Sequence, residues 1–133
     1  MIDVGDKKIT KRKAVAEGFI IVAPEVIDKI KNNKVPKGNV FDFAESAGLF
    51  AIKNTPYTIP HCHPVKITKA KINFEIENDK IRVICEVEGI DRTGFEMEAL
   101  YGVCVSLLTI YDMCKGFKKE MKITDIKLLS KQK

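Results

Sequence analysis

Both histidines of the chain lie in one short segment, "IPHCHP", with a cysteine between them. His61 and His63 form an H-x-H pair, which could supply half of a zinc or iron site. The chain has no third histidine, so a complete metal site needs Cys62 or a distant carboxylate. A nucleophilic Cys62 would need a base that faces the sulfur. Two interpretations remain beside these: a proline-stiffened loop without chemistry, and a site where His63 transfers protons or binds an anion.

Acidic residues stand near both ends of a long apolar stretch, in "GFEMEAL" and "YDMCK". Glu98 falls on the same side of a predicted helix as Val105 and Asp112, and this side is otherwise apolar, so its charge needs a partner. Asp112 and Lys115 are three residues apart and can touch on a helix. Such a pair on the surface would stabilise little. Because few polar residues precede it, we instead expect Asp112 to be largely buried and suited to acid–base chemistry.

Glu98 and Asp112 cannot both reach one small reacting centre from the same chain. Fourteen residues separate them, which corresponds to roughly 21 Å along a helix. Three explanations remain open: one of the two is unrelated to the chemistry, the ligand is long, or the pocket joins two subunits. A basic pocket between subunits would also explain a long helix with no polar face.

The segment "VPKGNV" is a weaker candidate for anion binding. Lys37 and Gly38 precede a predicted helix, whose free N–H groups could hold a phosphate together with the lysine. The segment does not match the P-loop pattern, which requires two glycines ahead of a lysine and a hydroxyl residue.

The elements that must position these residues follow from hydrophobic periodicity. "TPYTIPHCHP" contains three prolines, so we predict neither a helix nor a central strand there. Asn39 can cap the helix that follows it, and a bulge is expected near Lys69 to Lys71. The pattern predicts strands at 14–23, 65–77, 80–89 and 121–129, and helices at 24–33, 40–54 and 95–115. This order predicts an α+β fold, a ferredoxin-like antiparallel sheet with helices packed on one face, as a single domain over 1–133.

Composition narrows the class of protein. The chain has 133 residues, 45% hydrophobic and 31% charged, which is typical of a soluble globular domain. The longest apolar run is too short for a membrane span, and no secretory signal is recognisable. Cys85, Cys104 and Cys114 are expected to be small buried hydrophobic residues, and the absence of a disulfide pattern favours the cytoplasm. The net charge of +5 suits nucleic acid or a phosphorylated small molecule.

Several motifs occur together in a characteristic order: "KRKAVAEG", "KGNV", "AIKNT", "IPHCHP", "GFEMEAL", "LTIYDMCK" and "DIKLLSK". Over nearly its whole length the chain resembles the molybdenum cofactor biosynthesis protein C family, the cyclic pyranopterin monophosphate synthases. The resemblance implies a lyase that acts after a radical S-adenosylmethionine enzyme. It would convert 3′,8-cyclo-7,8-dihydro-GTP into cyclic pyranopterin monophosphate and release pyrophosphate. It also implies a ferredoxin-like fold and a homohexamer, a trimer of dimers with pockets at the dimer interface.

The resemblance assigns roles to individual positions. Asp112 matches the catalytic acid or base, and Lys115 matches a lysine that assists it. The substrate-contacting positions are His61, Cys62, His63, Met97 and Glu98, and the basic positions of the pocket are Arg12, Lys37, Lys53 and Lys131. No metal site and no required cofactor are implied, which leaves open that Mg²⁺ accompanies the triphosphate. His61 departs from the family pattern, since leucine is usual there.

Two alternatives belong to other functional classes. A non-catalytic basic module could bind RNA on the sheet, where such binders carry exposed aromatic side chains. The hairpin strands hold one aromatic residue, Phe74, on the apolar side that the helices should cover, which argues against stacking of bases. A purely structural subunit is the third possibility, and neither nucleic acid nor a membrane is the expected partner.

Overall fold

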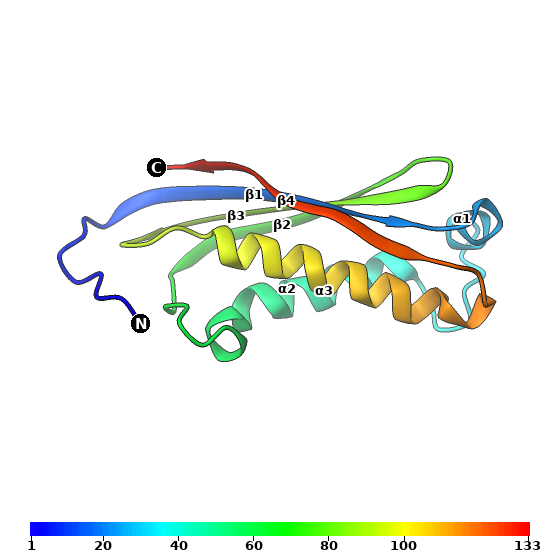
Figure 1. Cartoon of the computed structure of the whole chain (residues 1–133), viewed down its shortest axis with the longest axis horizontal. Coiled ribbons are helices and arrows are strands. Elements are labelled where there is room, and N and C mark those ends of the chain that lie inside the picture. Colours follow the sequence, from blue (N-terminus) through cyan, green and yellow to red (C-terminus); the bar gives the residue numbers. More distant parts are fainter.

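The computed structural model describes residues 1–133 as a four-stranded sheet with helices on one side (Figure 1). The sheet order is β2-β3-β1-β4, and every neighbouring pair is antiparallel. The predicted α+β, ferredoxin-like architecture is confirmed. The elements are β1 (Thr10–Ile21), α1 (Pro24–Lys31), α2 (Val40–Thr58), β2 (Ile67–Ile76), β3 (Lys80–Asp91), α3 (Glu96–Cys114), the 3₁₀ turn η1 (Lys115–Phe117) and β4 (Lys122–Gln132).

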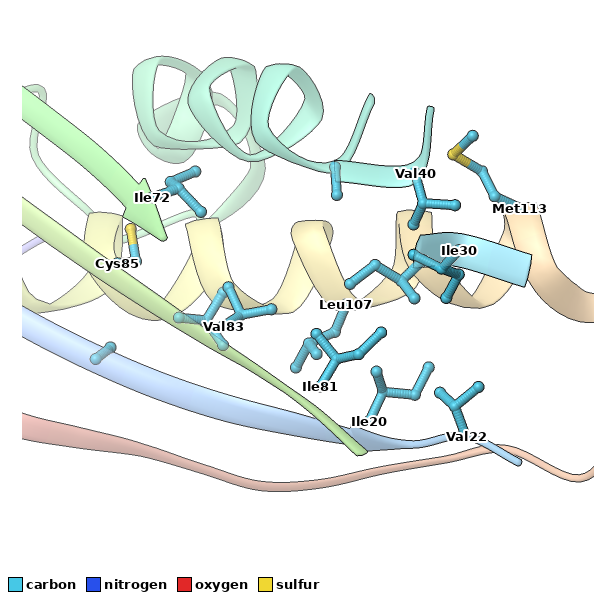
Figure 2. Close-up of a cluster of buried hydrophobic side chains, with 14 of the residues drawn as sticks. Ile20, Val22, Ile30, Val40, Ile72, Ile81, Val83, Cys85, Leu107 and Met113 are labelled. Atoms are coloured by element: carbon cyan, nitrogen blue, oxygen red, sulfur yellow. The ribbon is translucent and has the colours of Figure 1, made fainter. Parts of the chain in front are cut away.

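One face of the sheet forms the core with the helices. Alternate residues of the two central strands point to this face and are fully buried: Ala14, Ala16, Ile20, Ile81, Val83, Cys85 and Val87. This is the period-two pattern of a sheet covered on one side. Figure 2 shows four of them, Ile20, Ile81, Val83 and Cys85, in one cluster with Leu107 of α3, Ile72 of β2 and Val40 of α2. The core therefore holds α3 along the middle of the sheet.

Close packing of α2 against α3 depends on glycine. A Cβ atom at Gly48 would overlap the Ser106 hydroxyl oxygen and would lie 3.2 Å from the Gly102 carbonyl oxygen. The Ser106 hydroxyl donates a hydrogen bond of 3.0 Å to the Ala44 carbonyl oxygen, which ties the two helices together. Any side chain at position 48 would push these helices apart.

Helix α2 continues further than predicted. It runs to Thr58 and contains Pro56, so the prediction that the proline-rich segment is non-helical from residue 55 was wrong. Pro56 has no N–H to donate to the Ile52 carbonyl. The buried Thr55 hydroxyl lies 3.1 Å from that oxygen and 2.9 Å from the Ala51 carbonyl oxygen, and it replaces the missing donor. The helix thus carries the chain to Ile59, directly before the two histidines.

Several local predictions are confirmed. The Asn39 side chain caps α2 by accepting a hydrogen bond of 3.0 Å from the Asp42 N–H. The β2–β3 pairing shifts register between Ile67 and Lys69, close to the expected bulge. Phe74 faces α2 and stacks on Phe41 with ring centroids 4.8 Å apart, so the helical layer covers the aromatic residue of the hairpin.

The first and last strands of the chain are longer than predicted. β1 begins at Thr10, paired with Asp91, and β4 continues to Gln132, paired with Lys13. Lysines at these ends hide the alternation that marks a strand in sequence. The additional residues of both strands lie beside the start of α3.

All four cysteines are free thiols. Cys85 and Cys114 are buried as predicted, whereas Cys104 is only half-buried. By length and composition alone, the segment from Glu96 to Phe117 could span a membrane, although 50% of its apolar window is buried inside the protein. Because this helix contacts β1, β3 and α2, it is accounted for as the central helix of the core.

Candidate active site

The candidate residues form two groups, one at each end of α3. Lys37, Asp112 and Lys115 lie at its C-terminal end, where the loop between α1 and α2 passes (Figure 1). Cys62 contacts Glu98 at the N-terminal end, where the histidine loop connects α2 to β2. Glu98 and Asp112 are therefore separated in the folded chain, as predicted.

At the C-terminal end, Asp112 is held between two lysines. Lys37 Nζ lies 3.1 Å from Asp112 Oδ2 and 2.9 Å from the Asp112 carbonyl oxygen. Lys115 Nζ lies 3.2 Å from Oδ1, which confirms the predicted contact between these residues. Hydrogen bonds from Lys37 first and Lys115 second lower the pKa of Asp112. The carboxylate is thus ionised at neutral pH and can accept a proton.

Asp112 is not buried, and this corrects the prediction. Its side chain is 58% exposed, and Lys37 and Lys115 are similarly open. Glu98 and Asp112 do share one side of α3, but only the Glu98 end of that side is covered by another part of the chain, the loop that carries Cys62. An open ion pair contributes little to stability. The cluster therefore needs an explanation other than folding.

At the N-terminal end, Glu98 is 1% exposed, and burial raises its pKa. The partner that its position demanded is a thiol: Cys62 Sγ lies 3.7 Å from Glu98 Oε2. The sulfur thus faces a carboxylate, but burial first and Glu98 second raise the pKa of Cys62 to about 11. Cys62 remains a thiol at neutral pH, which argues against a nucleophilic role because thiolate is the reactive form.

The histidines line one wall of a depression at this end. His63 is half-buried and His61 is exposed. Together with Lys7 and Thr93 they border a cavity of about 590 Å³. His63 therefore reaches a space large enough for a ligand, as the anion or proton-transfer interpretation requires.

A second, basic depression of about 490 Å³ lies beside the start of α3. It brings together two predicted residues, Arg12 and Lys131, and Lys131 Nζ lies 3.4 Å from Glu96 Oε1. The sequence predictions missed the other residues that line it: Lys7, Lys8, Thr10, Thr93, Gly94, Glu96 and Lys133. The lysine pair in "GDKK" ahead of the first strand was the available signal.

Unpartnered polar atoms concentrate in the same place. Four buried side-chain atoms have no hydrogen-bond partner: Thr10 Oγ1, Arg92 Nε, Glu96 Oε2 and Glu98 Oε1. All four belong to residues at or near the N-terminal end of α3 or to the start of β1, which pairs with Asp91. Buried polar groups in folded proteins nearly always have partners. This cluster therefore indicates a place where a ligand or a second subunit supplies hydrogen bonds.

A family model described as the MoaC family matches residues 1–133. The chain belongs to the MoaC family. A relative from Thermococcus kodakarensis, named probable cyclic pyranopterin monophosphate synthase, is 46% identical across 100% of this chain and 90% of its own. Cyclic pyranopterin monophosphate synthase from Clostridium perfringens is 47% identical over 98% of this chain and 84% of its own. A probable synthase from Archaeoglobus fulgidus is 50% identical over 90% and 77%.

Membership of the MoaC family confirms the resemblance inferred from the motifs and makes this protein an enzyme with a small-molecule substrate. Not every position assigned by the resemblance joins one of the two groups. Lys53 is exposed on α2 and makes no hydrogen bond or ion pair, whereas Met97 stands beside Glu98 and is 37% exposed. No three histidine, cysteine or acidic side chains gather closely enough to hold a metal ion.

Proposed function

We propose that this protein is a cyclic pyranopterin monophosphate synthase. It would act as a lyase that converts 3′,8-cyclo-7,8-dihydro-GTP into cyclic pyranopterin monophosphate and pyrophosphate, in the cytoplasm, for molybdenum cofactor biosynthesis. Relatives that are named cyclic pyranopterin monophosphate synthase and match almost the whole chain support this proposal. The structural observation that carries it is a carboxylate of lowered pKa, Asp112, held by two lysines at an open surface.

The basic depression provides a site for the triphosphate. Lys7, Lys8, Arg12 and Lys131 line it from the N-terminal segment, β1 and β4. Cationic groups that are already in place stabilise the charge that develops on departing pyrophosphate. Mg²⁺ would arrive with the triphosphate, because the depression offers a single carboxylate, Glu96, as a protein ligand.

Asp112 and Lys115 would move protons while the five-membered ring of the purine opens and the pyranopterin forms. Lys37 contacts the Asp112 carboxylate and lowers its pKa, so Asp112 would enter the reaction as the ionised form. His63 and Glu98 would hold and polarise the base or sugar. Glu98 Oε1 has no hydrogen-bond partner within the chain.

The two groups would meet across a subunit interface. Helix α3 has 19 residues, which corresponds to roughly 28 Å, too far for one small substrate to touch both ends. Exposed apolar side chains on the outer faces of the helices support association: Phe43 (55%), Phe50 (65%), Tyr57 (86%), Leu108 (58%) and Tyr111 (40%). We infer a homo-oligomer, a hexamer arranged as a trimer of dimers, with Asp112 of one subunit facing Glu98 of another.

Incubation with the cyclised GTP intermediate tests the proposal, with pyrophosphate release as the measurement. The wild-type protein should release pyrophosphate, and Asp112→Asn should lower turnover by at least about 100-fold while the fold and assembly remain. Asp125→Asn is the matched control, since Asp125 is exposed and its φ of 54° is readily adopted by asparagine. Near-normal turnover by Asp112→Asn would contradict the role of Asp112, and an inactive wild-type protein would contradict the function.

A further inference from the structure

Asp91, at the end of β3, joins two segments of the site that are far apart in the sequence. Its Oδ2 atom accepts a hydrogen bond of 2.8 Å from the Lys66 N–H, and Oδ1 accepts one of 2.8 Å from the Arg92 N–H. Hydrogen bonds to an ionised acceptor are stronger than those between neutral groups. One carboxylate therefore fastens the end of the histidine loop to the turn that leads into α3.

Lys66 is fixed on its other side as well. The Ile90 N–H donates a hydrogen bond of 3.2 Å to the Lys66 carbonyl oxygen. A Cβ atom at position 89 would overlap that same oxygen, so Gly89 permits the close approach of the two backbones. His63 is only three residues before Lys66, so this attachment restrains the end of the loop that carries it.

Arg12 holds the same turn from β1. Its Nε atom donates to the Asp91 carbonyl oxygen at 3.3 Å, and one terminal nitrogen donates to the Arg92 carbonyl oxygen at 3.2 Å. The guanidinium that the resemblance assigned to the substrate is thus already engaged with the backbone. A continuous set of hydrogen bonds runs from β1 through Asp91 to the histidine loop.

The direct polar contact between the histidine loop and α3 is weak. Cys62 Sγ contacts Glu98 Oε2 at 3.7 Å, and a thiol is a poor donor. The loop would be free to move away from α3 if only this contact held it. Asp91 supplies the strong attachment between them.

We propose that Asp91 is a positioning residue that fixes His63 relative to Glu98 without touching the substrate. The expected loss of kcat rests on the proposed function, whereas the positioning of His63 by Asp91 does not. A displacement of about 1 Å in a catalytic group can lower a rate about 100-fold. Asp91→Ala should therefore lower kcat by about 10-fold to 100-fold, with a much smaller change in KM, because Lys7, Lys8 and Lys131 bind from other segments.

The experiment compares Asp91→Ala and Asp91→Asn with Asp79→Ala. Asp79 lies at the opposite end of the same hairpin, is exposed, and makes no side-chain hydrogen bond or ion pair, which makes it a matched control. The asparagine introduced by Asp91→Asn retains one acceptor oxygen, so this variant should fold and show an intermediate loss of kcat. The ring-proton NMR signals of His63, assigned with His61→Gln, should shift in both Asp91 variants and stay in place in Asp79→Ala.

Shifted His63 signals together with a lower kcat in folded Asp91→Asn would support the proposal. Unchanged His63 signals, or an unchanged kcat in the folded variant, would overturn it. A drop in thermal stability with wild-type kcat would likewise overturn it, because that result describes a purely structural residue. The NMR comparison needs no turnover, so an inactive wild-type protein would contradict the proposed function and leave the test of Asp91 intact.

Discussion

Lys37 Nζ lies 3.1 Å from Asp112 Oδ2, although 75 residues separate the two in the chain. The loop ahead of α2 brings the lysine to the C-terminal end of α3, where Lys115 already contacts the other carboxylate oxygen. Two ammonium groups contact one exposed carboxylate. Exposed ion pairs add little stability, so we expect this arrangement to act on the protonation of Asp112 instead.

Replacing Lys37 should change the protonation of Asp112. Lys37→Met removes the largest cause of the lowered pKa, so the pKa of Asp112 should rise toward its ordinary value of 3.8. The Asp112 carboxylate would then gain its proton at a higher pH than in the wild-type protein. Carboxyl-carbon NMR of Asp112 during an acid titration measures this change, and pyrophosphate release should fall in the same variant.

Lys119→Met is the control for Lys37→Met. Lys119 Nζ also lies 3.1 Å from a carboxylate, that of Glu25, with comparable exposure on both partners. This variant should leave both the Asp112 titration and the turnover as they are. An Asp112 titration that is the same in Lys37→Met and the wild-type protein would show that Lys37 does not govern this carboxylate.

Subunit mixing tests whether pockets are shared between chains. Asp112→Asn and Glu98→Gln should each be nearly inactive alone. The two variants are unfolded together and reassembled, so that about half of the dimers contain one chain of each variant. Each mixed dimer regains one of its two sites. The mixture should therefore show about a quarter of wild-type activity. Pyrophosphate release by the mixture, compared with each variant refolded alone, is the measurement. If mixing restores nothing, both residues serve the same chain's site or one has no part in it.

Cys62 should react slowly with iodoacetamide. A thiol with a pKa of about 11 in place of 9.0 carries about 100-fold less thiolate at pH 8. Glu98→Gln removes the second cause of the raised pKa and should accelerate labelling while burial still retards it. Peptide mass spectrometry at several pH values gives the rate for Cys62 alone. Labelling as fast as that of a free cysteine would mean that the thiol is neither desolvated nor next to a carboxylate.

The Thr55 hydroxyl should matter for stability because of the proline that follows it. Thr55→Val keeps the shape of the buried side chain but leaves the Ile52 carbonyl oxygen without a donor, at a cost of about 1–3 kcal/mol. Pro56→Ala restores an N–H at that position, so the same change in a Pro56→Ala background should cost less. Chemical unfolding of the four proteins gives the coupling. Equal losses in both backgrounds would show that the hydroxyl does not substitute for the missing donor.

Sequence periodicity was sufficient to predict the strands and helices and their order. The alternation of Ile81, Val83 and Cys85 shows which side of β3 meets the core, whereas α3 is apolar nearly all round. Periodicity could not predict that α2 continues through Pro56, because this depends on the contact of the Thr55 hydroxyl with the Ile52 carbonyl oxygen.

The site was less predictable, and for a physical reason. Periodicity shows that Glu98 and Asp112 share a side of α3 but not which neighbours cover each end of it. Asp112 was therefore wrongly expected to be buried, whereas Glu98, predicted only to need a partner, is the buried one. Likewise, Arg12 lines the basic depression, but its hydrogen bond to the backbone of Asp91 depends on the pairing of β1 with β3, which periodicity does not show.

The contact between Gly48 and Ser106 lies near the middle of α3, remote from both groups of polar residues. Because that helix is rigid, a side chain at position 48 would move the whole of α3 away from α2 and displace both of its ends together. Two pockets would lose alignment through one substitution that contacts neither. The positions of the site residues at both ends of α3 thus depend on the absence of a side chain at Gly48, which lies far from either site.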